Sequence, residues 1–279
     1  MTFYAETLGL SGSAFMLLRD LIHERTGLFY DNGKSDLLSD KLSPLVVERG
    51  FTSFLDYYYL LKYDSEADRE WKRVMNALSV QETFFWREAD QVRAVADVLV
   101  PQFFSTPRTR PLRIWSAACA TGEEPLTIAM ALNEKGWFDR EPIEIYATDA
   151  SAAAIERAQR GLYRERSFRT ISPQLRDKYF TEENGAQRIA PDLHARIKWA
   201  TANLMNESDV AMFATAPIIF CRNVFIYFSD DAIRKTVRQF AERMPEPGYL
   251  FTAASESLLR LTTAFQFQEI GGAFVYVKQ

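Results

Sequence analysis

LRIWSAACATGEEPLTIAM, residues 112–130, predicts a β-strand, a turn of small residues and an α-helix in immediate succession. Leu112, Ile114 and Trp115 give the apolar run of a buried strand, and every residue from 116 to 122 is small. Small residues let the backbone approach a ligand closely before a helix begins. The arrangement is typical of the edge of an α/β sheet at which a nucleotide-like ligand binds.

The predicted helix starts with two carboxylates, which argues against a phosphate ligand. Glu123 and Glu124 lie in its first turn beside Pro125, a residue that favours the first helical position. Acidic side chains complement the helix dipole, but they repel the phosphate that a helix start otherwise attracts. The sequence lacks the G-x-G-x-x-G spacing of dinucleotide-binding proteins, and no Gly-Lys-Ser/Thr follows Gly122. The loop therefore favours a neutral or cationic ligand that contains adenosine.

A second strand-to-helix turn supplies a candidate ligand for ribose. Residues 143–147 (IEIYA) form a β run, Thr148 and Asp149 follow it, and residues 151–160 have a helical pattern. An acid at the tip of the second strand of such a unit is where ribose hydroxyls are held. Asp149 is also placed to cap the helix that starts near Ala150, and both roles can hold together.

Apolar periodicity divides the chain into two regions. From Ser11 to about Ser105 it is helical, and in the second of these helices it predicts that Leu37, Leu42 and Val46 face the core. Beyond a polar linker at 108–110, predicted strands near residues 112, 143, 197, 217 and 249 alternate with helices, which argues for a mostly parallel sheet.

Two further turns are visible in this second region. Segments 265–267 and 274–277, around Gly271-Gly272, predict a closing antiparallel hairpin. Between residues 161 and 197, Glu183-Asn184-Gly185 is a turn signal between short β-like pieces.

Composition limits the classes of function. The 279 residues are 47% hydrophobic and carry a formal net charge of -4, so the chain has no global basic field for nucleic acid or an anionic membrane. No apolar run has the length of a membrane span, and residues 1–10 lack the pattern of a signal peptide. These features predict a soluble, cytoplasmic protein without membrane insertion. Cys119 and Cys221 lie in apolar motifs and are predicted to be small buried residues, and no paired Cys/His spacing indicates a metal site.

Four sequence blocks occur in an order that resembles a known family, the CheR-type chemotaxis methyltransferases. They are QETFFWRE (81–88), WSAACATGEEP (115–125), ATDAS (147–151) with RGLYR (160–164), and IFCRNVFIYF (219–228). The resemblance covers residues 11 to 277. It implies a protein-glutamate O-methyltransferase that transfers methyl from S-adenosylmethionine to chemoreceptor glutamates and releases S-adenosylhomocysteine.

The resemblance also implies a domain organisation. An all-α N-terminal domain (1–88) and a linker helix and loop (89–111) are expected to precede a Rossmann-like α/β methyltransferase domain with a mostly parallel sheet (112–279). A small antiparallel β insertion is expected at 168–196. Some family members use this insertion to hold a peptide tether of the receptor, but the segment is short here, so tether binding is not expected. The partner would be the cytoplasmic helical domain of a receptor, and the protein a monomer.

Site residues are carried over from the matching motifs. Arg87 and Tyr227 are the expected catalytic residues, Arg87 as a partner of the substrate carboxylate or as a rim salt bridge, and Tyr227 near the methyl site. Glu123 is expected to serve only the helix start. The expected contacts of S-adenosylmethionine are Gln81, Thr83, Arg87, Ala117, Glu124, Asp149, Asn203, Leu204, Arg222 and Asn223.

The expected chemistry is mild. A sulfonium methyl group is already activated and a glutamate carboxylate, with a pKa of about 4.3, is ionised at neutral pH, so no general base is needed. This agrees with the lack of a recognisable catalytic setting around His23 and His194. Two departures from the family bear on the substrate: residues 34–50 mix basic with acidic residues, and Ala253-Ala254-Ser255-Glu256 replaces a Gly-His-Ser-Glu segment. A chemosensory-like receptor outside flagellar chemotaxis is therefore compatible, and so is a regulatory module that binds the cofactor without turnover.

Overall fold

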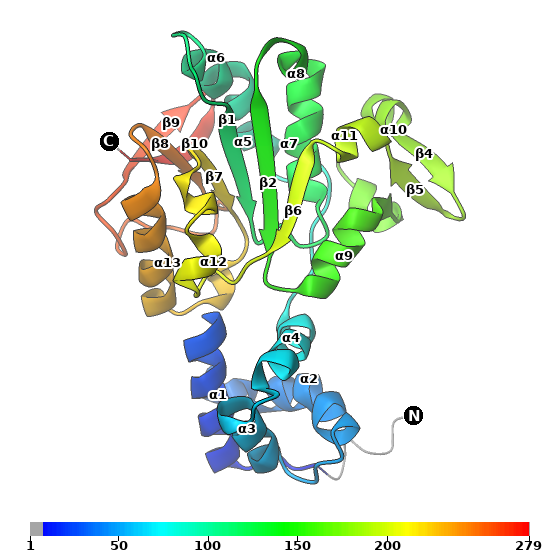
Figure 1. Cartoon of the computed structure of the whole chain (residues 1–279), viewed down its shortest axis with the longest axis vertical. Helices are drawn as coiled ribbons and strands as arrows, with labels where there is room; N and C mark the ends of the chain where they lie inside the picture. Colours follow the sequence, from blue (N-terminus) through cyan, green and yellow to red (C-terminus); the bar gives the residue numbers. More distant parts are fainter. Residues whose placement is uncertain (1–7, 279) are drawn as a thin grey trace.

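Residues 8–78 form the N-terminal helical domain of the computed structural model, which describes residues 8–278 (Figure 1). The prediction about a signal peptide therefore falls mostly outside the described residues. The four helices are α1 (Gly12–Thr26), α2 (Ser35–Glu48), α3 (Phe54–Tyr63) and α4 (Ala67–Leu78). Ser11 and Ser53 cap the starts of α1 and α3, and Gly27 ends α1 in the left-handed conformation.

The predicted apolar face of α2 is wrong by one position at its start. Leu37 is 47% exposed, whereas Leu38 and Leu42 are fully buried. The side chains of α2 that face the core are those at 38, 42, 45 and 46. Leu37 lies about 100° around the helix from Leu38, outside this face.

The segment after this domain packs against the sheet. Helix α5 (Ala89–Ala94) continues through a π-helical turn (Val95–Leu99) into α6 (Val100–Phe103). Val92, Val95 and Leu99 belong to the same apolar core as β1 and α7, so only the stretch that follows α6 up to β1 is an exposed loop.

A seven-stranded sheet with the order β6-β2-β1-β7-β8-β10-β9 forms the centre of the second domain. Five of its strands are parallel, and β9 and β10 form the predicted antiparallel hairpin at the edge. The strands are β1 (Leu112–Ala117), β2 (Ile143–Asp149), β6 (Ile197–Thr201), β7 (Ile218–Cys221), β8 (Gly248–Phe251), β9 (Gln266–Ile270) and β10 (Ala273–Lys278). The mostly parallel α/β sheet that the sequence predicted is thus confirmed.

Helices cover both faces of this sheet. On one face α5, α7 (Glu123–Glu134) and α9 (Ala152–Arg160) share a core with β1 and β2, and α8 (Trp137–Arg140) follows α7. On the other face α12 (Glu207–Val210) and α13 (Asp230–Arg243) share a second core with the sheet, which includes Trp115 of β1 and Phe240 of α13. No helix among residues 8–278 is long and apolar enough to cross a membrane.

A small antiparallel sheet with the order β3-β5-β4 extends from the side of this domain. Asn184 and Gly185 form its tight turn, both with positive φ, as the sequence indicated. The sheet reaches back to residue 162, before the predicted insertion. Its strands are β3 (Leu162–Tyr163), β4 (Phe180–Glu183) and β5 (Ala186–Ile189). Helix α10 (Pro173–Tyr179) precedes β4, and α11 (Pro191–His194) follows β5.

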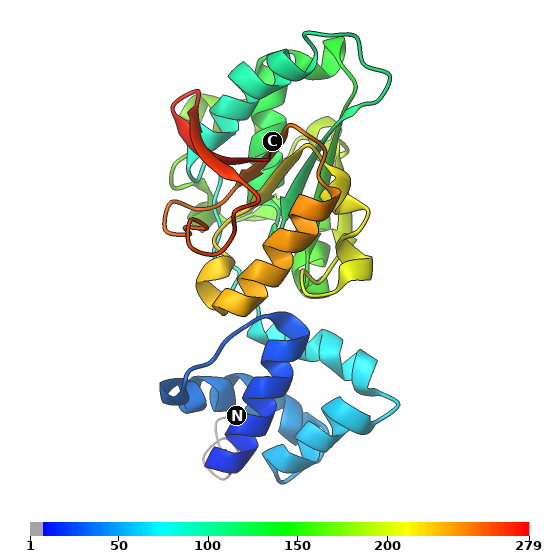
Figure 2. The same cartoon turned by 90° about the vertical axis from the view of Figure 1, so that its left-hand side faces the viewer.

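The helical domain faces the carboxyl ends of the parallel strands, as Figures 1 and 2 show. A β-bridge joins Leu28 to Phe228, and His23 Nε2 lies 2.6 Å from Ser229 Oγ at the start of α13. Asn76 of α4 accepts hydrogen bonds from Ser151 Oγ and from the Ala153 amide at the start of α9. The edge at which an open α/β sheet binds its ligand is therefore covered by the other domain.

Candidate functional site

The loop between β1 and α7 has an unusual backbone. Ala118, Ala120 and Gly122 all have positive φ, of 59°, 49° and 95°. Only glycine adopts this region at little cost, so the two alanines are held there by their surroundings. The Cys119 amide donates to the Thr148 carbonyl, and the Ala120 amide donates to Asp149 Oδ2. The loop is thus fixed to the end of β2.

Two adjoining cavities of about 520 and 640 Å³ lie at this edge of the sheet. Val80, Ala118, Ala120 and Asn223 line both, so the cavities are two halves of one cleft. The helical domain supplies part of the second cavity. Its contribution there is Thr26, Leu28, Met75 and Ser79.

Asp149 lines the second cavity at the tip of β2. Its Oδ1 accepts from the Ser151 amide at 2.8 Å and its Oδ2 from the Ala120 amide at 2.9 Å. Ser151, and not Asp149, is the N-cap of α9, because its Oγ accepts from the Ala154 amide. Burial raises the pKa of Asp149, and the two backbone donors oppose that rise. Leu204 and Asn203 line the same cavity.

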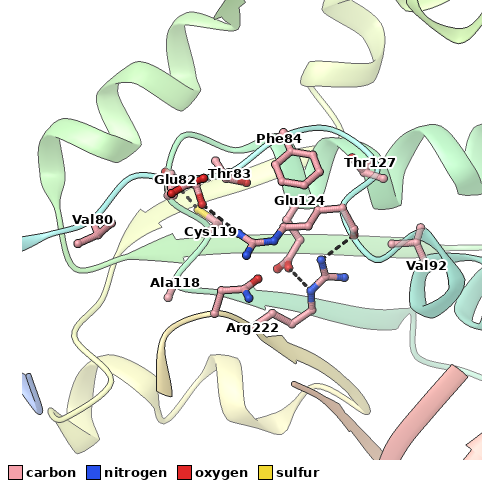
Figure 3. A pocket seen from close by; sticks show the side chains of 13 residues that line it. Val80, Glu82, Thr83, Phe84, Val92, Ala118, Cys119, Glu124, Thr127 and Arg222 are labelled. Atoms are coloured by element: carbon pink, nitrogen blue, oxygen red, sulfur yellow. Dashed lines mark hydrogen bonds and ion pairs between the residues drawn. The ribbon is translucent and has the colours of Figure 1, made fainter. Parts of the chain in front are cut away.

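The first cavity contains a buried group of opposite charges (Figure 3). Arg222, at the end of β7, is 6% exposed, and it donates to the Arg87 carbonyl at 2.7 Å and to Gln91 Oε1 at 3.2 Å. Its Nε lies 3.1 Å from a Glu124 oxygen and 3.4 Å from a Glu88 oxygen, neither in hydrogen-bonding alignment. Glu124 also accepts from Ser116 Oγ at 2.6 Å. Burial raises the pKa of Glu124, and the charge of Arg222 opposes the rise.

This group fits the amino acid end of S-adenosylmethionine. Arg222 Nε and the nearby Glu88 Oε2 are buried and have no hydrogen-bond partner among the described residues. Arg222 and Glu124 line the first cavity, so the carboxylate of a zwitterion can accept from the guanidinium and its ammonium group can donate to Glu124, whereas Glu88 lines neither cavity. The chain offers these groups without a phosphate-binding motif, in agreement with the acidic start of α7.

Segment 81–87 covers the first cavity. Thr83, Phe84 and Arg87 line it, and the Arg87 guanidinium donates to the Glu82 carbonyl and lies 5.5 Å from the centre of the Phe84 ring. Tyr227 lines the second cavity. Burial raises the pKa of Tyr227; Glu82 adds to the rise and Arg87 opposes it.

Four residues singled out from the sequence have side chains engaged elsewhere. Gln81 accepts from Arg157 of α9 at 2.6 Å and is not part of either cavity wall. Ala117 is buried inside the sheet, and its neighbour Ala118 lines the cleft instead. Asn203 Nδ2 donates to the Arg25 carbonyl of α1, so this side chain joins the two domains. Glu123 is buried and accepts from Thr121 and Ser167, which agrees with a role at the helix start.

Glu256 is a buried acid near the cleft that sequence reasoning did not place in the site. It is 6% exposed and accepts from the backbone amides of Asn223, Ile226 and Ala253. It thereby fixes the loop that carries Asn223 and Tyr227 to the cleft. The replaced Gly-His-Ser-Glu segment, in which the acid is kept, is the signal that could have pointed to it.

The cysteines and histidines are occupied structurally. Cys119 and Cys221 are buried, free thiols, and burial raises the pKa of both. His194 Nε2 lies 2.9 Å from the Ala158 carbonyl, and His23 contacts Ser229 between the domains. Residues 8–278 contain no group of three or more metal-ligating side chains.

The sheet order, the covered cleft and the buried group of opposite charges agree with an S-adenosylmethionine-dependent methyltransferase. Two family models divide the chain: residues 13–79 match "CheR methyltransferase, all-alpha domain" and residues 81–273 match "CheR methyltransferase, SAM binding domain". The chain belongs to the CheR methyltransferase family and binds S-adenosylmethionine.

Similar curated proteins cover nearly the whole chain. A chemotaxis protein methyltransferase 2 of Vibrio cholerae is 29% identical over 272 residues, which are 96% of this chain and 94% of that protein. The chemotaxis protein methyltransferase of Escherichia coli is 31% identical over 268 residues, 93% of this chain and 90% of that protein. The resemblance of the four sequence blocks is thus confirmed, together with the expected cofactor.

Proposed function

We propose that this protein methylates glutamate side chains of a chemoreceptor or of a related chemosensory receptor, and so forms glutamate methyl esters. The observation that carries the proposal is the placement of Arg87 and Tyr227 in the two adjoining halves of the cleft. Arg87 lines the first cavity and Tyr227 the second. A cation and a hydroxyl donor can together hold an incoming carboxylate.

The residues of the cleft need only bind and orient. S-adenosylmethionine supplies an activated sulfonium methyl group when bound. In the transfer a carboxylate oxygen forms a bond to the methyl carbon, the bond from that carbon to sulfur breaks, and no proton moves. Arg222 and Glu124 would hold the amino acid end and Asp149 the ribose, which would fix the methyl group for in-line attack. Burial raises the pKa of Tyr227, so its hydroxyl group stays protonated and can donate a hydrogen bond.

A regulatory module that binds the cofactor without turnover is the second candidate. Within the set Thr83, Arg87, Asp149, Arg222 and Tyr227, a module that only binds the cofactor would need Asp149 and Arg222. Arg87 and Tyr227 favour an enzyme, since such a module gains nothing from a cation and a hydroxyl placed for an incoming carboxylate. A small-molecule methyltransferase is a third class. Deletion of the helical domain would not test it, because that domain forms part of the second cavity and its loss would affect cofactor binding for any substrate.

The decisive experiment incubates the protein with methyl-labelled S-adenosylmethionine and cytoplasmic receptor fragments from its own host. We expect base-labile methyl label on a receptor helix. Tyr227→Phe should bind the cofactor normally in calorimetry and transfer methyl about tenfold more slowly, because only the orienting hydroxyl is lost. Tight cofactor binding with no label on any host receptor would instead favour the regulatory module. A monomer acting in the cytoplasm on the helical domain of the receptor, without the tether, completes the proposal.

A further inference from the structure

The RGLYR motif, residues 160–164, borders a hollow of about 1320 Å³ that the proposed chemistry does not use. The hollow lies beside the loop of residues 118–122: Thr121 lines it, while the preceding Ala120 lines both halves of the cofactor cleft. The Tyr163 hydroxyl donates to the Thr121 carbonyl at 3.0 Å, which fixes the motif to this loop. Four cations line the hollow, which we call the arginine groove: Arg157, Arg160, Arg164 and Arg166.

The charges of the arginine groove are available to a partner. All four of its arginines are exposed, and none forms an ion pair within residues 8–278. The acids nearby are occupied, since Glu165 pairs with Arg176 and Glu183 with Arg188. Glu123 at the base is buried and accepts from two hydroxyl groups. The groove is therefore a concentration of positive charge on a chain whose net charge is -4.

Helix α2 does not provide a comparable surface. Lys41 donates to the Ala77 carbonyl, and Arg49 pairs with Glu66 and with the buried Glu70. Lys34, just before the helix, pairs with Asp31. Lys34 and Arg49 are thus paired with acids and Lys41 is bound to backbone carbonyls, whereas the arginines of the groove have no acidic partner within residues 8–278.

The arginine groove is connected to the cover of the cofactor cleft. Arg157 donates to Gln81 at 2.6 Å. Next along the chain, Glu82 lines the first cavity and pairs with Arg169, whose guanidinium lies 4.1 Å from the centre of the Phe84 ring. The arginine groove therefore adjoins the segment that covers the first cavity.

We propose that the arginine groove binds the acidic face of the protein substrate. A helix that inserts one glutamate at Arg87 would set carboxylates one or more turns away against Arg160, Arg164 and Arg166. Arginine suits this partner because its planar fork binds carboxylates in a bidentate manner. Selection of the substrate would then depend on the charge around the methylated residue as well as on the residue itself. This inference rests on the proposed function.

The test compares two double charge reversals. Arg160→Glu with Arg164→Glu alters the arginine groove, and Arg108→Glu with Arg110→Glu is the matched control in the exposed loop before β1, at the opposite end of the sheet. With a receptor fragment at low salt, we expect the groove variant to raise KM about tenfold and to leave kcat and cofactor affinity unchanged. High salt should shrink the difference, because exposed charges are screened. The control should behave as the unaltered protein.

A binding measurement decides the inference independently of turnover. Fluorescently labelled poly-L-glutamate is titrated with each protein, and its anisotropy is followed. Loss of binding in the groove variant alone supports the inference, whereas equal binding and equal KM in all three proteins would overturn it. Displacement of poly-L-glutamate by a peptide from the receptor C-terminus would also overturn it, by assigning the groove to a tether. If the unaltered protein labels no receptor, the proposed function fails, and the poly-L-glutamate titration still decides what the groove binds.

Discussion

Each oxygen of the Asp149 carboxylate accepts one backbone hydrogen bond, from Ser151 and from Ala120. A carboxylate has further acceptor capacity, so the same group can also receive a ribose hydroxyl. With a ribose bound there, as proposed, Asp149 would couple the shape of the loop of residues 118–122 to the presence of the ligand. Of the two roles predicted from sequence, the ribose contact stays a prediction, whereas the helix cap belongs to Ser151.

Asp149→Ala should abolish measurable cofactor binding. The change leaves the amides of Ala120 and Ser151 without a partner, at about 1–3 kcal/mol each, and it also removes the proposed ribose contact. Calorimetry on protein whose fold has been verified by circular dichroism measures the loss. To separate the two effects, adenosine and 2′,3′-dideoxyadenosine should be compared as competitors on the unaltered protein. Equal affinity of the two would refute a ribose contact at Asp149.

Cofactor affinity should decrease on acidification through the titration of Glu124. Burial raises the pKa of Glu124 above its usual range, and only the ionised form has the negative charge that attracts an ammonium group. Affinity is therefore full above this raised pKa and falls as the pH falls through it, at a higher pH than an ordinary glutamate would cause. Binding should be measured between about pH 8 and pH 5. Glu124→Gln should weaken binding at pH 8 and flatten the profile; an unchanged profile would exclude Glu124.

The residues at the strand ends were predictable and the backbone of the loop was not. Asp149, Glu124 and Arg222 follow from strand patterns and family motifs, because the carboxyl ends of parallel strands meet at one edge. Ala118 and Ala120 have positive φ, which alanine rarely adopts, so their residue type does not predict these turns, whereas Asn223 is of a type that tolerates this conformation. Their conformations are set by contacts with β2 and with Glu256, which are distant in sequence.

At the scale of elements, the loop after β7 depends on one buried acid. Glu256 accepts from three backbone amides, two of them in the segment 223–227. The long strands and helices were predictable from periodicity, as β1, β2 and α13 illustrate. The two-residue strand β3 and the π-helical turn at 95–99 carry no period of their own, so sequence patterns could not show them.

Glu256→Ala should damage both stability and turnover. The three amides would lose a charged acceptor inside the protein, which costs about 2–4 kcal/mol and loosens the support of Tyr227. Glu256→Gln keeps the shape and one acceptor oxygen, so it should retain more of both properties. Thermal unfolding and single-turnover methyl transfer measure the two effects. If Glu256→Ala had the thermal stability and the kcat of the unaltered protein, Glu256 would not be positioning the loop.

At the scale of the whole molecule, the walls of the cleft are shared between the domains. The second cavity takes walls from α1, α4 and the segment after α4 as well as from the sheet. Single polar contacts join the two halves: His23 with Ser229, Asn203 with Arg25, and Asn76 with Ser151. Each pair is far apart in the chain and shows no pattern, which is why sequence analysis could predict two domains but not their fit.

Asn76→Ala tests whether the fit of the domains controls affinity. Asn76 Oδ1 accepts from Ser151 Oγ at 2.8 Å and from the Ala153 amide at 3.2 Å, next to the amide that Asp149 binds. Its loss should therefore loosen α4 from α9 and raise the Kd for S-adenosylmethionine about three- to tenfold, with little change in thermal stability, since each domain keeps its own core. Gln159→Ala is the matched control, because Gln159 is exposed on the same helix α9.

Limited proteolysis gives a second readout of the same contact. In Asn76→Ala the segment between the domains, near residue 80, should be cleaved faster, and saturating S-adenosylmethionine should restore protection, because a ligand that touches both domains holds them together. The control variant should be cleaved at the rate of the unaltered protein. Identical affinity and identical cleavage in Asn76→Ala would mean that the remaining contacts hold the domains together without Asn76, and that its hydrogen bonds only cap α9.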